Sequence, residues 1–80
     1  MNDFVQILNN KIPFLKTKNL PVKSIDKRDA LWIFHLDNRG WEEDYYLNEN
    51  SITGIVIENG KMTIKQDLFT GHKVETEFVW

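Results

Sequence analysis

The sequence has no cysteine among its 80 residues, and this absence removes several classes of protein at once. Without thiols there is no disulfide framework, no thiolate metal site and no cysteine nucleophile. Apolar runs are short as well: none approaches the roughly 18 residues of a membrane span, and Met1-Asn2-Asp3-Phe4 lacks the basic segment that opens a signal peptide. We therefore expect a cytoplasmic protein that has no membrane partner.

Proline is scarce, with two residues, but apolar residues are not. They make up 41% of the chain and include three Trp, two Tyr and five Phe. This content suffices for a globular core and argues against general disorder. A chain of this length forms one small domain, residues 1–80, which a single core must stabilise.

Clustered positive charge is confined to the start of the chain. Residues 1–28 hold six Lys or Arg and two acids, whereas residues 29–80 hold four Lys or Arg and ten acids. Binding to phosphates needs clustered Lys and Arg, so the acidic part disfavours nucleic acid and favours a protein partner with a basic surface. The basic stretch over residues 11–28 fits a solvated connector better than a site for an anionic partner.

The first residues predict a helix. Phe4, Val5, Leu8 and Ile12 recur at steps of three and four residues, which places them on one stripe of a helix over residues 2–12. Pro13 should end it, because proline removes a backbone donor and restricts the preceding residue. Residues 13–29 are then predicted as a connector, with a short edge strand over residues 20–25.

The remainder, residues 30–80, has the pattern of an antiparallel meander. Short alternating segments are separated by turn residues at intervals of about ten. The predicted fold class is α+β, an N-terminal helix packed on a curved antiparallel meander sheet of five to six strands. The turns lie at Asn38-Arg39-Gly40, Glu49-Asn50-Ser51, Asn59-Gly60 and Thr70-Gly71.

Turn chemistry also predicts the register of each hairpin. Asn59-Gly60 suits a type I′ turn and sets Glu58 opposite Lys61. A three-residue loop, Phe69-Thr70-Gly71, aligns Met62 with Phe78. A type I turn over Asp37-Asn38-Arg39-Gly40 closes Asp37 on Trp41 and sets Ile33 opposite Tyr45. A three-residue loop, Glu49-Asn50-Ser51, is expected to join the next two strands as neighbours.

With these registers, one face of the sheet forms the core. Its predicted residues are Leu31, Ile33, Trp41, Tyr45, Leu47, Ile55, Ile57, Met62, Ile64, Leu68, Val74, Phe78 and Trp80.

The opposite face then carries an aromatic group that suits a binding surface. Trp32, Phe34 and Tyr46 break the rule that the outer face of a half-buried sheet is polar, and Glu42 and Asp44 lie between them. These five residues are the predicted partner-binding site, for a protein with a basic surface or for a second copy of the chain. Three structural explanations compete: a curled sheet buried on both sides, a cover formed by residues 20–25, or shielding of Gly54 by Tyr46.

A second candidate site surrounds His35. In the predicted register His35 lies opposite Glu43, and Tyr45 and Trp41 complete a possible pocket between helix and sheet. A lone His–Glu pair is more often structural than catalytic, so no catalytic residue is predicted. Neither His35 nor His72 has metal-ligand spacing, so we predict no metal and no other cofactor.

These observations leave three functions. The first is a small non-enzymatic protein-binding or inhibitory module that acts through an aromatic and acidic sheet face. The second is a small-molecule binder or minor enzyme that uses the His35 pocket. The third is a homo-oligomeric structural or assembly subunit.

Overall fold

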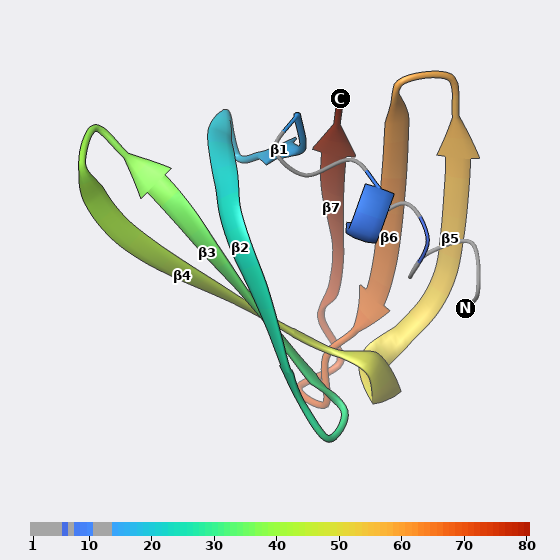
Figure 1. The fold of residues 1–80 in the computed structure, drawn as a ribbon. Coiled ribbons are helices and arrows are strands. Elements are labelled where there is room, and N and C mark those ends of the chain that lie inside the picture. The colour runs from blue at the N-terminus through green and yellow to red at the C-terminus, as the bar shows by residue number, and fades with distance from the viewer. Residues whose placement is uncertain (1–5, 7, 11–13) are drawn as a thin grey trace.

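A computed structural model describes residues 6, 8–10 and 14–80 of the chain. They form one antiparallel sheet with strand order β4-β3-β2-β1-β7-β6-β5 (Figure 1). The strands are β1 (Lys16–Thr17), β2 (Leu20–Arg28), β3 (Leu31–Asn38), β4 (Trp41–Asn48), β5 (Ile52–Glu58), β6 (Lys61–Asp67) and β7 (Lys73–Val79), and the 3-10 turn η1 (Glu49–Ser51) joins β4 to β5.

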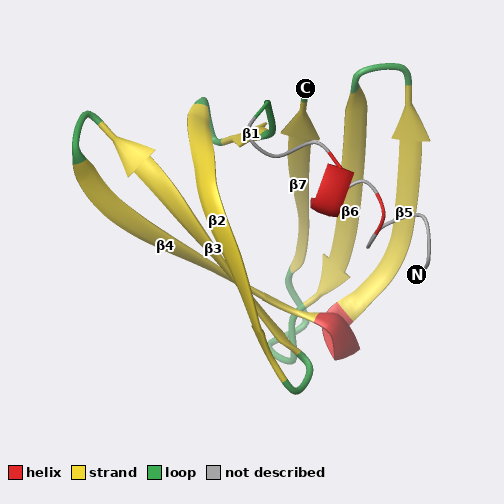
Figure 2. Ribbon diagram, in the orientation of Figure 1, coloured by secondary structure: helices red, strands yellow, loops and turns green. Residues whose placement is uncertain are grey.

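The sheet consists of two three-stranded parts, β2-β3-β4 and β7-β6-β5, that stand at an angle to one another (Figure 2). The two-residue strand β1 pairs with β2 on one side and β7 on the other, so it joins the parts. Side chains meet between them: the rings of Phe34 and Phe78 lie 4.9 Å apart, and the hydroxyls of Tyr45 and Thr76 share a hydrogen bond. The core therefore lies in the angle of the sheet, and its buried residues are Leu8, Leu15, Val22, Trp32, Phe34, Leu36, Leu47, Met62, Ile64 and Phe78.

The predicted α+β class is wrong, because the described chain is nearly all sheet and has seven strands instead of five or six. No N-terminal helix stands among its elements. Most of the predicted helix over residues 2–12 lies outside the described residues; residue 6 and residues 8–10 have helical backbone, and Leu8 is buried in the core. The structure describes no helix that is long and apolar enough to cross a membrane.

The predicted connector over residues 13–29 is also wrong, because these residues contain β1 and β2. The short strand predicted over residues 20–25 does form as the first part of β2, but it is not an edge strand, because β2 pairs with both β1 and β3. β2 runs for nine residues, pairs with β3 along most of its length and buries Val22. Its exposed positions hold charged side chains such as Lys23 and Lys27. A strand with one solvated face tolerates such residues, and this is why the stretch resembles a connector in the sequence.

Both later hairpins confirm the predicted register. Glu58 pairs with Lys61 across Asn59 and Gly60, and Met62 pairs with Phe78. The predicted type I′ conformation of the first of these turns is wrong, because Gly60 has a positive φ of 80° and Asn59 does not have positive φ. Gly71 has a φ of 85°, the left-handed conformation that the three-residue loop requires. The pairing of β5, β6 and β7 thus follows from the turns together with the inward-facing apolar residues.

The hairpin of β3 and β4 differs from the prediction by one residue. Arg39 and Gly40 both have positive φ, 53° and 91°, so they form a two-residue turn and pair Asn38 with Trp41. Ile33 consequently lies opposite Tyr46 rather than Tyr45. A slip of one residue turns every side chain of a strand to the other face.

This slip reverses the faces of β3. Trp32, Phe34 and Leu36 point into the core, whereas Trp41, predicted to be in the core, is 79% exposed. The observed register buries two aromatic rings and a leucine, which removes more apolar surface from water than the predicted one.

The meander is not continuous either. β4 and β5 form the two opposite edges of the sheet and do not pair, because η1 carries the chain from one edge to the other. Asn48 begins η1 with a side-chain oxygen that accepts a hydrogen bond from the Asn50 backbone, 2.9 Å away. The predicted loop of Glu49, Asn50 and Ser51 therefore exists as a 3-10 turn, but it does not make neighbours of the flanking strands.

Candidate functional site

β4 is an edge strand whose free side is acidic. Within the described residues it pairs with β3 alone. The two-residue turn makes Asn38 and Trp41 a hydrogen-bonded pair, and bonded and non-bonded pairs then alternate along an antiparallel ladder. The backbone N–H and C=O groups of Glu42, Asp44 and Tyr46 consequently point away from β3.

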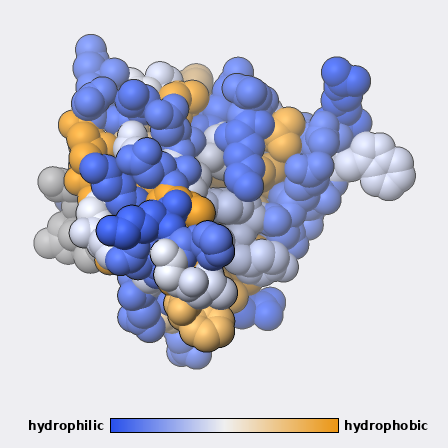
Figure 3. Space-filling model, turned by 180° about the vertical axis from the view of Figure 1, so that it is seen from behind, coloured by the Kyte–Doolittle hydropathy of each residue, from blue (hydrophilic) through white to orange (hydrophobic). Residues whose placement is uncertain are grey.

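The side chains along this edge are mostly solvated. Trp41 and Tyr46 are 79% and 55% exposed, and the three acids between them, Glu42, Glu43 and Asp44, are exposed as well. Glu42 lies 3.7 Å from the Lys23 ammonium, at a site where both groups are half exposed. Seen from behind, the molecule presents a largely hydrophilic surface in which hydrophobic side chains form separate spots (Figure 3). The feature that distinguishes this edge is therefore acidic charge with an aromatic residue at each end.

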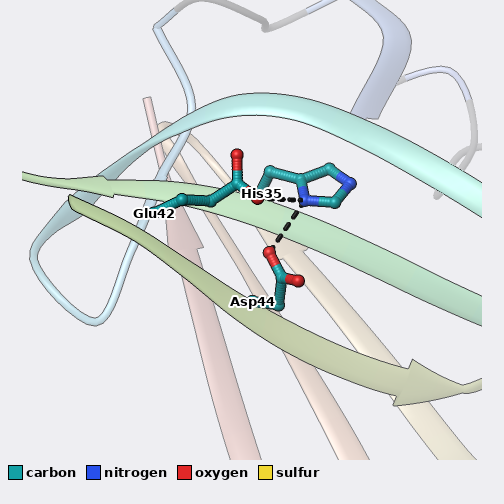
Figure 4. Close-up of side chains that lie close together, drawn as sticks. All are labelled: His35, Glu42 and Asp44. Carbon is teal, nitrogen blue, oxygen red and sulfur yellow. Dashed lines mark hydrogen bonds and ion pairs between the residues drawn. The ribbon is translucent and has the colours of Figure 1, made fainter. Parts of the chain in front are cut away.

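His35 forms the most closely connected polar cluster, on the outer face of β2-β3-β4. Its Nδ1 lies 2.8 Å from Asp44 Oδ1 and its Nε2 lies 2.7 Å from Asp26 Oδ2. Glu42 adds a carboxylate oxygen 3.5 Å from Nδ1, and Figure 4 shows Glu42 and Asp44 turned toward the ring. Both ring nitrogens face carboxylates, so both bonds form only when the ring is protonated and donates from each nitrogen.

These contacts raise the pKa of His35 above its ordinary value. The hydrogen bond to Asp26 contributes most, followed by the bond to Asp44, and the charges of Asp44 and Glu42 add smaller contributions. Partial burial acts in the opposite direction, because it disfavours the charged ring.

The raised pKa predicts a pH-dependent stability. Because the pKa of His35 is higher in the folded chain, the charged ring stabilises the fold fully below about pH 6.5, the ordinary value. This contribution is lost as the pH rises through the raised folded pKa. Urea unfolding at a series of pH values should show the free energy of unfolding falling over that interval, and the His35→Gln variant should lack the fall. An unchanged pH profile in the variant would contradict the assignment.

The same cluster includes the described residues best placed to hold a metal. The ligand atoms of His35, Glu42 and Asp44 lie within 4.8 Å of one another. A cation there would replace the proton on Nδ1, and Asp26 would keep the hydrogen bond to Nε2–H, as carboxylates do behind metal-bound histidines. In the structure the same atoms form ion pairs around the ring.

The residues of the predicted binding face do not come together. Trp32 and Phe34 are buried, with 6% and 0% of their surface exposed, and Trp32 Nε1 donates to Glu49 Oε1 at 3.0 Å. Tyr46 lies on the opposite face of the sheet, where it is exposed beside Glu42 and Asp44. The two acids and the tyrosine of the prediction thus remain together on β4, and the tryptophan and phenylalanine belong to the core.

The predicted pocket residues are also divided. His35 lies on the outer face, opposite Asp44 rather than Glu43. Glu43, Tyr45 and Trp41 alternate onto the other face, where Tyr45 packs against Phe34 at the core. A surface groove of 540 Å³ opens elsewhere, between Tyr46 on β4 and Leu68 and Phe69 after β6, and none of the pocket residues lines it.

Sequence reasoning missed Asp26, the strongest partner of His35. Asp26 belongs to β2 but lies one residue beyond the short edge strand predicted over residues 20–25, in a part of the predicted connector for which no pairing with β3 was expected. The only signal for it in the sequence is Asp29, because aspartate tolerates the positive φ of a turn that would end a strand. The structure gives Asp29 a φ of 53° directly after β2.

Comparison with known proteins gives no match: no family model, no curated protein and no solved structure is similar to this chain.

Proposed function

We propose that this protein is a protein-binding module that takes an extended basic segment of its partner onto the free edge of β4. One observation carries the proposal: the outward backbone groups of Glu42, Asp44 and Tyr46 lie on a strand whose exposed side chains are acidic and aromatic. The class of function is the one that the sequence suggested. The surface differs, because the β4 edge replaces the face that contained Trp32 and Phe34.

The binding mode follows from the geometry of strand addition. A partner segment next to β4 would exchange backbone hydrogen bonds with Glu42, Asp44 and Tyr46, and main-chain bonds of this kind supply affinity in such complexes. Lys or Arg side chains on the segment would lie opposite the acids, and each opposite-charge cross-strand pair is worth about 0.2–1 kcal/mol. Trp41 and Tyr46 would supply rigid apolar contact area at the two ends.

A purely protective role for the acids is the competing explanation. Charged residues on edge strands also prevent uncontrolled pairing with other chains. Protection predicts that no added strand binds, so a binding experiment distinguishes the two roles.

The test is titration of the labelled protein with a blocked peptide of alternating Lys and Val. Binding should perturb the backbone amides of Glu42, Asp44 and Tyr46 more than those of Glu43 and Tyr45, because only the first set points outward. Affinity should fall with added salt, as expected for exposed charges. Absence of binding, or shifts centred on another strand, would overturn the proposal.

A pair of matched charge reversals sharpens this test. The double variant Glu42→Lys with Glu43→Lys should weaken peptide binding by about tenfold or more, because like charges then meet. The control, Glu75→Lys with Glu77→Lys, makes the same change in net charge on exposed positions of β7, which is not an edge strand. Equal weakening by both variants would show that net charge alone attracts the peptide.

A further inference from the structure

The second edge of the sheet, β5, differs from β4 in having almost no charge. Its sequence is Ile-Thr-Gly-Ile-Val-Ile-Glu, so residues 52–57 contain no charged residue and no proline. Val56 and Ile57 are each 42% exposed. Edge strands usually carry charges, prolines or bulges that discourage pairing with another chain, and an apolar edge without charge or proline favours it.

The adjoining turn determines which backbone groups of β5 face outward. Glu58 and Lys61 flank the two-residue turn and are therefore a hydrogen-bonded pair, as is the pair of Val56 and Thr63 two residues along. The N–H and C=O groups of Ile55 and Ile57 consequently point away from β6. An irregularity between Ile52 and Gly54 limits the regular edge to residues 54–58.

We propose that β5 pairs antiparallel with β5 of a second copy of this chain, around a two-fold axis at Val56. This register hydrogen-bonds Ile55 of each copy to Ile57 of the other and uses every outward group of the regular edge. Val56 faces its own counterpart in a closely spaced non-bonded pair, and Glu58 faces Gly54, so no like charges meet. The occupant is a second copy rather than a charged partner because the edge is apolar and self-complementary.

The acidic side chains of β4 disfavour the same antiparallel pairing between the β4 strands of two copies. Two copies of β4 would bring Glu42, Glu43 and Asp44 of each chain close to those of the other, and like charges across a strand pair are unfavourable. Pairing through β5 instead gives one continuous sheet across both copies. The β4 edges then lie at its two far ends, where each stays free for a partner.

The experiment is sedimentation equilibrium of the full chain over a concentration series. The chain should dimerise, and Val56→Glu should weaken dimerisation about tenfold or more, because two carboxylates would then oppose each other at the axis. Val79→Glu is the matched control: Val79 is 39% exposed, but β7 pairs with both β1 and β6. A chain that stays monomeric at every concentration, or equal effects of the two variants, would overturn the proposal.

Amide hydrogen exchange provides a test without any substitution. The amides of Ile55 and Ile57 should exchange slowly at concentrations where the dimer forms and faster on dilution. The amide of Val56, which bonds to β6, should change much less. Fast exchange of Ile55 and Ile57 in a sample that sediments as a dimer would show that the interface lies elsewhere and would overturn the β5 register.

Discussion

Phe34→Ala should lower the free energy of unfolding by about 3–5 kcal/mol, the usual cost of removing a buried phenylalanine ring. Phe34 has no exposed surface, and its ring lies 4.9 Å from that of Phe78 and 6.1 Å from that of Tyr45. It therefore joins β3 and β4 to β7 across the angle of the sheet. A domain of this size has only about 5–15 kcal/mol of total stability, so this loss is a substantial fraction of it.

Urea denaturation of the variant and a matched control measures this effect. Phe69 is the control, because it is the same residue type but is 102% exposed in the loop between β6 and β7. Phe69→Ala should change the free energy of unfolding by no more than about 0.5 kcal/mol. Each kcal/mol corresponds to a shift of about 4–8 °C in Tm for a domain of this length. Similar losses in both variants would contradict the burial of Phe34.

The register of the two later hairpins was predicted correctly from their turns. The two-residue turn at Asn59 and Gly60 sets Glu58 opposite Lys61, although only Gly60 has positive φ (80°) and the predicted type I′ conformation is therefore not formed. Gly71 plays the same part in the loop before β7, where its φ is 85°. In both hairpins the turn residues and the positions of the inward-facing apolar residues indicate the same register.

The register of the hairpin of β3 and β4 was predicted wrongly because its sequence is compatible with two turn lengths. Gly40 can occupy the left-handed position with either a two-residue or a longer turn, and Arg39 is not a residue that favours positive φ. The structure places Arg39 at a φ of 53°. The free energy gained when the whole fold buries Trp32 and Phe34 offsets this local cost. The sequence of the hairpin by itself does not indicate that these two side chains will be buried.

The fold class was predicted wrongly for a related reason. β1 and β2 are held by pairing with β7 and β3, and β1 has only two residues. The charged residues of β2 mask its strand character, since they lie on positions that stay solvated in the folded sheet. Asp26, the strongest hydrogen-bond partner of His35, could not be placed without that strand.

Substitution of the two tryptophans in the hairpin of β3 and β4 should have very different effects on stability. The structure buries Trp32 to 6% exposure, bonds its Nε1 to Glu49 and places the Lys27 ammonium 5.4 Å from its ring centroid. Trp41, next to the turn, is 79% exposed. Trp32→Ala should therefore cost about 3–5 kcal/mol of unfolding free energy, and Trp41→Ala no more than about 0.5 kcal/mol. The register predicted from the sequence gives the reverse order, with Trp41 inside and Trp32 outside.

The unfolding free energies of these two variants decide the register of β3 and β4, because the turn at Arg39 and Gly40 determines both the core and the acidic edge. Measured side by side in urea, Trp32→Ala should lose about 3–5 kcal/mol of unfolding free energy and Trp41→Ala almost none. A larger loss for Trp41→Ala would show that β3 and β4 pair one residue away from the register described. Trp32 and Phe34 would then return to the surface, and the outward groups of Glu42, Asp44 and Tyr46 would no longer form the binding edge.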